Sequence, residues 1–467
     1  MTKFKKYENY KKTNIDWLDE IPSNWNMLPN RAIFRERITR NCDKEELLSV
    51  TIKNGIIKQT QLLKNSSKKD SSNEDKSKYK LVKINDIAYN KMRMWQGAVG
   101  VSNYQGIVSP AYIILNPRAD INSKYYHYLY RSPKYIRYSY NYSYGICDDQ
   151  LSLRYKDFSK MYSVIPPKEE QNKIVDFIEH KEKQINKLIK KQKKLIELLE
   201  EKKKIIITEA VTKGLDKSIP MKDSGIDYIG QIPQNWEVRK LKFITLCNKY
   251  TLEEQTDKNK RINYIDIGSV TNKDGITDVQ EMLFKDAPSR ARRIVHTNDT
   301  IISTVRTYLK AIAYIDEKYD NYICSTGFAV ITPKNNVDSR FLFYLLHSDK
   351  FICEVERIST GANYPAITPT KLINLKCLMP NIQEQIKIRK YVEKIEMKIN
   401  KSIDNKNTLI DRLEEYKKTL ISYAVTGQID VRDYEFSETD DNIDLDEIEN
   451  ISEDDTETIS EVEYANN

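Results

Sequence analysis

The sequence predicts an α+β protein with a pseudo-two-fold internal duplication. Two mixed α/β domains are joined by two long helices, which form an intramolecular antiparallel coiled coil. The stretches 170–211 and 384–425 contain neither Pro nor Gly and repeat apolar residues at heptad spacing. They align without a gap at an offset of 214 residues. Because shorter segments before each stretch also match, the chain reads as one unit repeated twice.

Each long stretch carries an apolar seam whose spacings alternate between four and three residues. Such spacing keeps one stripe of a helix facing a partner helix, so it predicts a coiled coil. In the first stretch the polar residues Lys181, Gln192, Lys202 and Glu209 interrupt the seam, as register-setting residues can. The predicted seam residues are Ile174, Ile178, Ile185, Leu188, Leu195, Leu199 and Ile206 in the first helix, and Ile388, Val392, Ile395, Ile399, Leu409, Leu413 and Leu420 in the second.

The segments that lead into each globular domain repeat as well. Residues 14–25, NIDWLDEIPSNW, match residues 225–236, GIDYIGQIPQNW, at an offset of 211. We expect Trp25 and Trp236 to plug each domain onto its helix rather than to contact a ligand. Both long stretches open with Glu-Gln and close with Ala-Val-Thr.

These matches divide the chain into five segments. The last one is acidic, because no Lys or Arg follows Arg432 and residues 433–467 hold fifteen Asp plus Glu; we expect it to be disordered. The predicted segments are 1–168 for the first globular domain, 169–213 for the first spacer helix, 214–382 for the second globular domain, 383–428 for the second spacer helix and 429–467 for the acidic tail.

Local patterns predict the elements of the first domain. Residues 81–89 indicate a strand, a turn at Asn85-Asp86 and a second strand. Residues 108–115 predict another strand, and the Tyr-rich segment 124–138 predicts a helix. Residues 64–78 are entirely polar, so we expect a mobile surface loop there.

The second domain repeats this plan. Asn298-Asp299 matches Asn85-Asp86, Gly361 matches Gly145, and the helical segment 124–134 aligns with 340–350. The offset drifts between 211 and 216 inside the globular halves, so we expect insertions there and none between the two long helices.

Composition limits the class of protein. The net charge of +8 conceals a basic body, because residues 1–432 hold 76 Lys plus Arg against 53 Asp plus Glu, a net charge of +23. A basic body favours an anionic partner, nucleic acid first, although a solvated Lys-rich surface would give the same count. No long apolar run or signal core is present, which predicts a soluble cytoplasmic protein. The six Cys and four His have no metal-ligand spacing, so we expect reduced, mostly buried thiols and no metal site.

No motif for catalysis is present. Neither a GxxxxGK[ST] phosphate loop nor a GxGxxG dinucleotide loop occurs. The segment Ser109-Pro-Ala-Tyr112 faintly resembles the Asn/Asp-Pro-Pro-Tyr loop of amino-methyltransferases, but Ala111 breaks that pattern. The sequence therefore predicts a chain without catalytic activity or a cofactor of its own.

Two loops combine cationic, aromatic and amide side chains. The first, 90–97, follows a predicted strand, and the second, 303–310, occupies the equivalent place in the other domain. Such side chains contact phosphates, stack on bases or bond base edges. Met92, Met94 and Trp95 are equally compatible with core positions. The candidate DNA-binding residues are Lys91, Arg93, Trp95 and Gln96 in the first domain, and Arg290, Arg292, Arg293, Arg306, Tyr308, Lys310, Asn363 and Tyr364 in the second.

Several short motifs, each present in a fixed order and most of them duplicated, together point to one protein family. They are the two Ile-Pro-x-Asn-Trp segments, the run Asn85 to Gly100, the segments Gly106 to Tyr112 and Ser325 to Phe328, and the Pro-x-x-x-Glu-Gln start of each helix at Pro166 and Pro380. The chain resembles the specificity (S) subunit of type I restriction–modification systems over nearly all of residues 14–428.

The resemblance implies two target-recognition domains, each reading one half of a bipartite, asymmetric duplex DNA site. It implies that the helices space these domains and dock two methyltransferase (M) subunits, which bind S-adenosylmethionine and methylate adenine. Motor-nuclease (R) subunits, which use ATP and Mg, would join for cleavage. Helices of this length span about 60 Å at 1.5 Å per residue, as a ruler between half-sites would. The alternatives are a stand-alone two-headed DNA-binding adaptor of another defence or regulatory system, and a coiled-coil scaffold without a DNA role.

Overall fold

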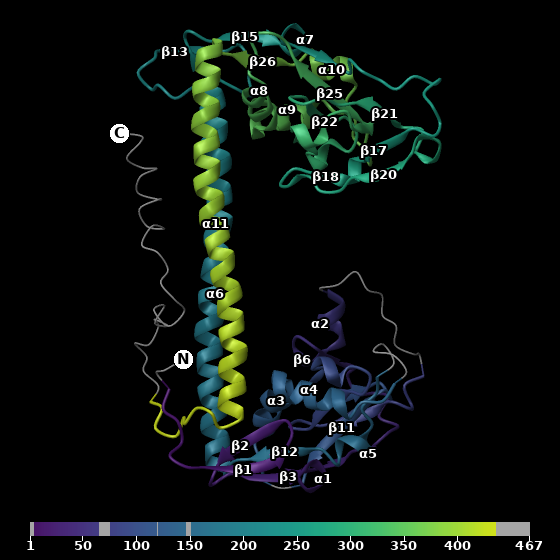
Figure 1. Ribbon diagram of the computed structural model, residues 1–467, viewed down its shortest axis with the longest axis vertical. Coiled ribbons are helices and arrows are strands. Elements are labelled where there is room, and N and C mark those ends of the chain that lie inside the picture. The colour runs from purple at the N-terminus through teal and green to yellow at the C-terminus, as the bar shows by residue number, and fades with distance from the viewer. Residues whose placement is uncertain (1–3, 65–74, 119, 146–150, 436–467) are drawn as a thin grey trace. The chain divides into compact units, whose positions relative to one another are not determined.

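The chain folds as two compact units in the computed structural model, which describes residues 4–64, 75–118, 120–145 and 151–435 (Figure 1). The first unit comprises residues 1–193 and 406–467, and the second comprises residues 194–405. Each unit contains one globular domain and a part of both long helices, α6 (Lys168–Lys213) and α11 (Ile382–Val425). Most of the polar segment 64–78 and of the acidic tail lies outside the described residues, so the expectations for them are not assessed.

The globular domain of the first unit is built on a four-stranded antiparallel sheet with the order β4-β11-β8-β9. Two-stranded pairs β1-β2, β3-β12, β5-β6 and β7-β10 surround it. Its elements are β1 (Tyr10–Ile15), β2 (Leu18–Pro22), β3 (Asn26–Pro29), α1 (Asn30–Ile33), β4 (Phe34–Glu36), β5 (Leu48–Thr51), β6 (Gly55–Lys58), α2 (Gln59–Lys64), β7 (Lys80–Val82), β8 (Ile87–Asn90), η1 (Met94–Gln96), β9 (Val99–Val101), β10 (Gly106–Val108), β11 (Tyr112–Pro117), α3 (Ser123–Arg131), α4 (Pro133–Asn141), α5 (Tyr155–Phe158) and β12 (Tyr162–Ile165).

The second unit repeats the sheet as β16-β25-β22-β23 and adds another, β20-β17-β24-β21, which contains the parallel pair β17-β24. Its elements are β13 (Met221–Asp223), β14 (Gln231–Pro233), β15 (Glu237–Lys240), α7 (Leu241–Ile244), β16 (Thr245–Cys247), β17 (Arg261–Ile265), η3 (Ile267–Ser269), β18 (Val270–Thr271), β19 (Gly275–Ile276), β20 (Gln280–Leu283), η4 (Phe284–Asp286), β21 (Ala291–Ile294), β22 (Thr300–Ser303), η5 (Thr307–Leu309), β23 (Ile312–Tyr314), η6 (Glu317–Tyr319), β24 (Ile323–Ser325), β25 (Phe328–Pro333), α8 (Ser339–His347), α9 (Asp349–Ile358), α10 (Pro369–Ile373) and β26 (Lys376–Met379).

The duplicated turn at Asn85-Asp86 and Asn298-Asp299 is built the same way in both domains. Each Asn has a positive φ, 68° and 76°, a conformation that Asn tolerates better than most residues. Each buried Asp then accepts a backbone N–H, from Lys83 at 2.9 Å or from His296 at 2.8 Å. The turn leads directly into β8 or β22, and these strands carry the loops proposed to meet DNA.

The strand, turn and second strand predicted for residues 81–89 are confirmed: β7 and β8 flank the turn at Asn85-Asp86, and they pair with β10 and β11. Two other local predictions failed because neighbouring segments decide the structure. Residues 108–115 are not one strand, since the chain turns between β10 and β11. The predicted helix at 124–138 is two helices, α3 and α4, because Pro133 cannot continue α3 and instead begins α4, with Ser132 as its N-cap.

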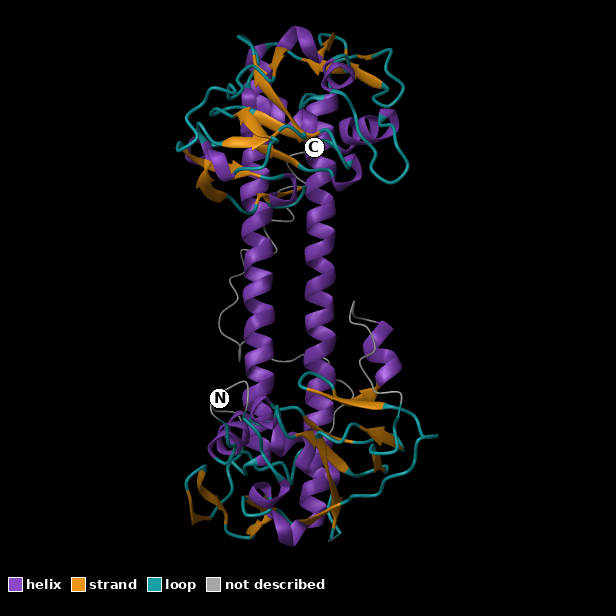
Figure 2. Ribbon diagram, turned by 90° about the vertical axis from the view of Figure 1, so that its right-hand side faces the viewer, coloured by secondary structure: helices purple, strands orange, loops and turns teal. Residues whose placement is uncertain are grey.

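Within each unit the two long helices lie side by side (Figure 2), and the residues that bond across them show that they run antiparallel. In the first unit Lys173 donates to the Arg432 carbonyl at 2.6 Å and Lys417 donates to Asn186 at 3.0 Å. In the second unit Lys203 donates to Asn400 at 3.0 Å. None of the fourteen predicted seam side chains is exposed; those that are buried are Ile174, Ile178, Ile185, Ile388, Val392, Ile395, Ile399, Leu413 and Leu420.

The fold class is therefore confirmed: two mixed α/β domains joined by two long helices. No helix among the described residues is long and apolar enough to cross a membrane. The thiols differ from expectation, because of the five described cysteines Cys324 and Cys377 are buried, while Cys353 is exposed.

Candidate nucleic-acid interface

A carboxylate at the start of each long helix, buried in the first domain and half-buried in the second, anchors the domain that carries the candidate loops. Glu170 accepts hydrogen bonds from the Trp25 indole N–H at 2.9 Å, from the Asn24 amide at 3.0 Å and from the Tyr7 hydroxyl. The next residue, Gln171, accepts the backbone N–H of Asn122 at 2.8 Å. Trp25 is fully buried, so it plugs the domain onto the helix and cannot reach a ligand.

The second domain repeats this anchor. The Trp236 indole donates to Glu384 at 2.8 Å, and Gln385 accepts the backbone N–H of Asp338 at 2.9 Å. Further along the helices, Tyr128 donates to Glu182 at 2.9 Å and Tyr344 donates to Glu396 at 2.6 Å. The matching Glu-Gln and Asn-Trp motifs are therefore the two halves of one domain-to-helix contact, present once in each repeat.

The first candidate loop leaves β8 and turns through η1. Met94 is fully buried, so it belongs to the core, as one of the two interpretations allowed. Trp95 is half-buried: its indole N–H donates to the Met92 carbonyl at 3.1 Å, and its ring packs edge-on against Tyr140 with centroids 5.9 Å apart. Arg93 and Gln96 are exposed, and the loop closes at Gly97, whose φ of 83° suits glycine.

Charge remains available on this loop. Among the described residues, the half-buried Lys91 ammonium and the exposed Arg93 guanidinium have no ion-pair partner in the protein. A short bridge between Tyr144 and Ser152 lies next to the loop, because Leu153 donates its N–H to the Lys91 carbonyl at 2.8 Å. Two cations without an ion-pair partner, near the exposed rings of Tyr140 and Tyr144, suit binding to a polyanion with stacked bases.

The second candidate loop leaves β22 and turns through η5. Arg306, Tyr308 and Leu309 are exposed, whereas Lys310 is half-buried and lies 3.8 Å from the Glu356 carboxylate. Bridges from Ala366 to Val305 and Thr360 attach the turn 360–366 to this loop.

This turn places an aromatic residue beside an arginine. The Arg306 guanidinium lies 5.0 Å from the centre of the Tyr364 ring, within cation–π range, and Tyr364 and Asn363 are both exposed. The structure thus brings Arg306, Tyr308, Asn363 and Tyr364 to adjacent segments of one surface.

The three arginines before this loop do not form a free basic cluster. Arg290 is paired with Asp266 at 3.1 Å and also donates to the Tyr264 hydroxyl. Arg292 stacks over Phe284 at 4.8 Å, while half-buried Arg293 donates to the Thr326 carbonyl at 3.4 Å, and burial lowers its pKa. Each of the three has a partner within the fold, and their contact with DNA stays a prediction.

Sequence reasoning missed two exposed side chains, one near the candidate loop of each domain. Leu309 is 45% exposed, although nothing in its local pattern distinguishes it from a core leucine. Tyr144 is 66% exposed and precedes Gly145, which the repeat alignment already matched to Gly361 beside Tyr364. That alignment could have identified Tyr144.

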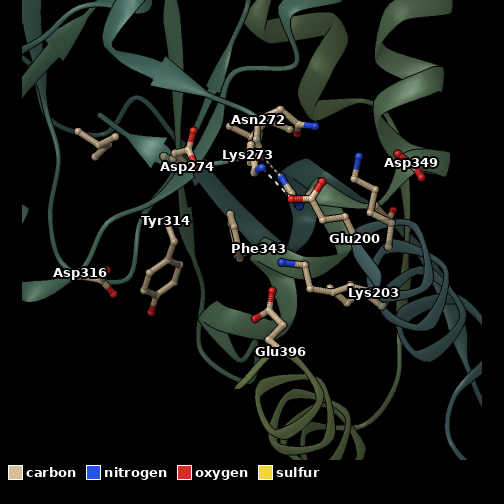
Figure 3. Close-up of a pocket in the computed structure, with 18 of the residues that line it drawn as sticks. Glu200, Lys203, Asn272, Lys273, Asp274, Tyr314, Asp316, Phe343, Asp349 and Glu396 are labelled. Carbon is tan, nitrogen blue, oxygen red and sulfur yellow. Dashed lines mark hydrogen bonds and ion pairs between the residues drawn. The ribbon is translucent and has the colours of Figure 1, made fainter. Parts of the chain in front are cut away.

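A cavity of about 320 Å³ lies where the second domain meets the parts of α6 and α11 in its own unit (Figure 3). Lys273 from the β18–β19 turn pairs with Glu200 of α6 at 2.7 Å, and His347 contacts the Asn272 carbonyl at 3.1 Å. In the first domain the residue aligned with His347 is Arg131, which donates to four carbonyls, including those of Ile52 and Lys53. His347 therefore makes fewer hydrogen bonds to the β18–β19 turn than Arg131 makes to the β5–β6 turn, because an imidazole is smaller than a guanidinium.

Comparisons with known proteins agree with this architecture. Residues 233–415 match a family model described as the type I restriction modification DNA specificity domain. A Methanocaldococcus jannaschii protein assigned as the specificity subunit of the MjaX type I restriction enzyme is 26% identical over 453 residues, which is 92% of this chain and 99% of that protein. The HindI specificity subunit of Haemophilus influenzae is 30% identical over 132 residues, 27% of this chain and 28% of that protein.

Two solved structures share the fold. A chain from a study of complex assembly and conformational transition of the type I restriction–modification system superposes with a TM-score of 0.64 at 13% identity, covering 88% of this chain and 99% of its own. The HsdS subunit of Thermoanaerobacter tengcongensis superposes with a TM-score of 0.52 at 15% identity, covering 88% and 98%. Residues 233–415 therefore belong to the family of type I restriction modification DNA specificity domains, and the chain as a whole is similar to type I restriction enzyme specificity subunits.

Proposed function

We propose that this chain supplies the DNA sequence specificity of a cytoplasmic type I restriction–modification complex and contributes no catalysis of its own. Each globular domain reads one half of a bipartite, asymmetric duplex site. The observation that carries the proposal is that the two repeats share one sheet and one anchor but present different side chains on the loop after β8 or β22. A common frame with divergent loops is what two readers of different half-sites require.

The loops differ position by position in ways that matter for base recognition. Arg93, Met94, Trp95, Gln96 and Gly97 correspond to Arg306, Thr307, Tyr308, Leu309 and Lys310 at an offset of 213. An arginine opens both loops and suits guanine or phosphate. Gln96 bonds adenine edges, whereas Leu309 offers only an apolar contact. The predicted half-sites therefore differ in sequence.

Partners supply the chemistry in this proposal. Two M subunits with S-adenosylmethionine methylate adenine, and R subunits with ATP and Mg move and cut DNA. Among the described residues of this chain, no group of His, Cys, Asp or Glu is placed to hold a metal ion. The two long helices, with 46 and 44 residues, hold the readers and offer the surface on which M subunits assemble.

The decisive experiment maps adenine methylation across the host genome with and without this gene while the M partner is expressed. We expect methylation to disappear at one split, asymmetric motif when the gene is deleted. A second strain carries Arg306→Ala, which is expected to relax one half of that motif only. An unchanged methylome would contradict the proposal and favour a stand-alone DNA-binding adaptor, whereas absence of salt-dependent DNA binding would leave only a scaffold.

A further inference from the structure

The loop after β22 holds two residues in a backbone conformation that side chains disfavour. Arg306 and Lys310, which flank the single turn η5, have φ angles of 51° and 52°. In the first repeat the corresponding residues are Arg93, with a φ of −137°, and Gly97. Left-handed backbone at non-glycine residues is costly and is concentrated at functional sites, where surrounding structure enforces it.

Buried threonines enforce this conformation. Thr304 donates both its N–H, at 2.7 Å, and its hydroxyl, at 2.8 Å, to the Gly327 carbonyl. A Cβ at Gly327 would lie too close to the Ile267 Cδ1, so a larger residue there would require the Ile267 side chain to move. Thr307 donates its hydroxyl to Ser359 at 2.9 Å and its N–H to the Pro365 carbonyl at 3.3 Å. These hydrogen bonds therefore fix the start of the turn, on both sides of Arg306.

This rigid turn presents two large side chains to solvent. Tyr308 is 51% exposed and Leu309 is 45% exposed, although both lie on a well-anchored segment next to the core. The first repeat does not present such a pair, because Trp95 is held by the Met92 carbonyl and Tyr140, and Gln96 takes the place of Leu309. Core packing does not explain why a strained turn should expose an apolar residue.

We propose that Tyr308 and Leu309 form a wedge that enters one base step of the half-site read by the second domain. Apolar side chains on rigid turns unstack base steps in this way, and the cost is offset by contacts that the bent duplex allows. Arg306, backed by the Tyr364 ring, directly precedes the wedge and is placed for a flanking phosphate. The first domain reads its half-site without a wedge. This inference rests on the proposed function.

The test uses the complex of this chain with its M subunits and duplexes that contain the mapped motif. A single abasic position is moved through both half-sites, and the dissociation constant is measured at each one. An abasic position at the wedge step removes the unstacking cost, so the wild-type complex should bind that duplex about tenfold more tightly than intact DNA. Leu309→Ala and Leu309→Gln, the residue found in the first repeat, should abolish this gain. Leu246→Ala, at an exposed leucine on β16, should keep it.

The target adenines give an internal reference, because methyltransferases flip the base that they modify. A gain at those positions should appear in both half-sites and survive Leu309→Ala. The wedge is overturned if Leu309→Ala weakens binding to intact and abasic duplexes by the same factor, or if no position outside the target adenines gives a gain. A wild-type complex that binds no mapped motif above random DNA would instead refute the proposed function.

Discussion

Removing the carboxylate that anchors the first domain should destabilise the first unit far more than the second. In Glu170→Ala, the Trp25 indole and the Tyr7 hydroxyl lose their acceptor while they remain buried. Each buried, unsatisfied donor costs about 1–3 kcal/mol, so two donors cost roughly 4 kcal/mol. For a unit of this size, 1 kcal/mol corresponds to about 2–4 °C, which gives a predicted decrease in Tm of about 8–16 °C.

Two variants make this prediction sharper. Glu384→Ala leaves one buried indole, that of Trp236, without its acceptor, so the second unit should lose about 2 kcal/mol. Glu179, which lies on α6 like Glu170, forms an exposed ion pair with Lys124 of α3. Glu179→Ala removes only this pair, and such pairs contribute about 0–1 kcal/mol.

Differential scanning calorimetry of the full chain measures the outcome, because the two units should unfold in separable transitions. Glu170→Ala is expected to shift one transition and Glu384→Ala the other, with the larger shift for Glu170. If Glu170→Ala behaves like Glu179→Ala, the anchor does not carry the stability argued for it. Equal shifts of both transitions would refute the assignment of each anchor to its own unit.

Three further predictions follow from the fold and the candidate interface. Arg93→Ala and Arg306→Ala should each relax one half of the methylated motif at a cost of about 1–3 kcal/mol in DNA affinity; equal weakening on all sequences would make them phosphate contacts. Burial lowers the pKa of His127 to about 3, so the first unit should lose stability as the pH falls below about 6.5, by up to about 1.4 kcal/mol per pH unit. His127→Gln should remove this slope in urea unfolding at pH 7 and pH 5; a slope that persists would place the titration elsewhere. Deleting one heptad from each long helix, about 10 Å of rise, should shorten the unread gap by about three base pairs while both half-sites stay, and an unchanged gap in the methylome would refute the ruler.

The candidate interface was only partly predictable from the sequence. Arg306, Tyr308, Asn363 and Tyr364 were found because their residue types suit DNA and their loops occupy equivalent places in the repeat. The run of arginines at 290–293 looked equally suitable, yet its members pair with an aspartate, an aromatic ring and a backbone carbonyl. A sequence lists charges but does not show which of them the fold already neutralises.

The sequence by itself determined the duplication, the two long helices and their heptad seams, because helical periodicity and an ungapped internal match are local properties that need no knowledge of distant neighbours. Only the tertiary structure decided that Glu170 and Glu384 each receive a buried indole from a segment about 145 residues away. It also decided that Leu309 faces solvent on a turn held by Thr304 and Thr307. These features depend on long-range packing, in which partners far apart in the chain fix the backbone and the exposure of each side chain.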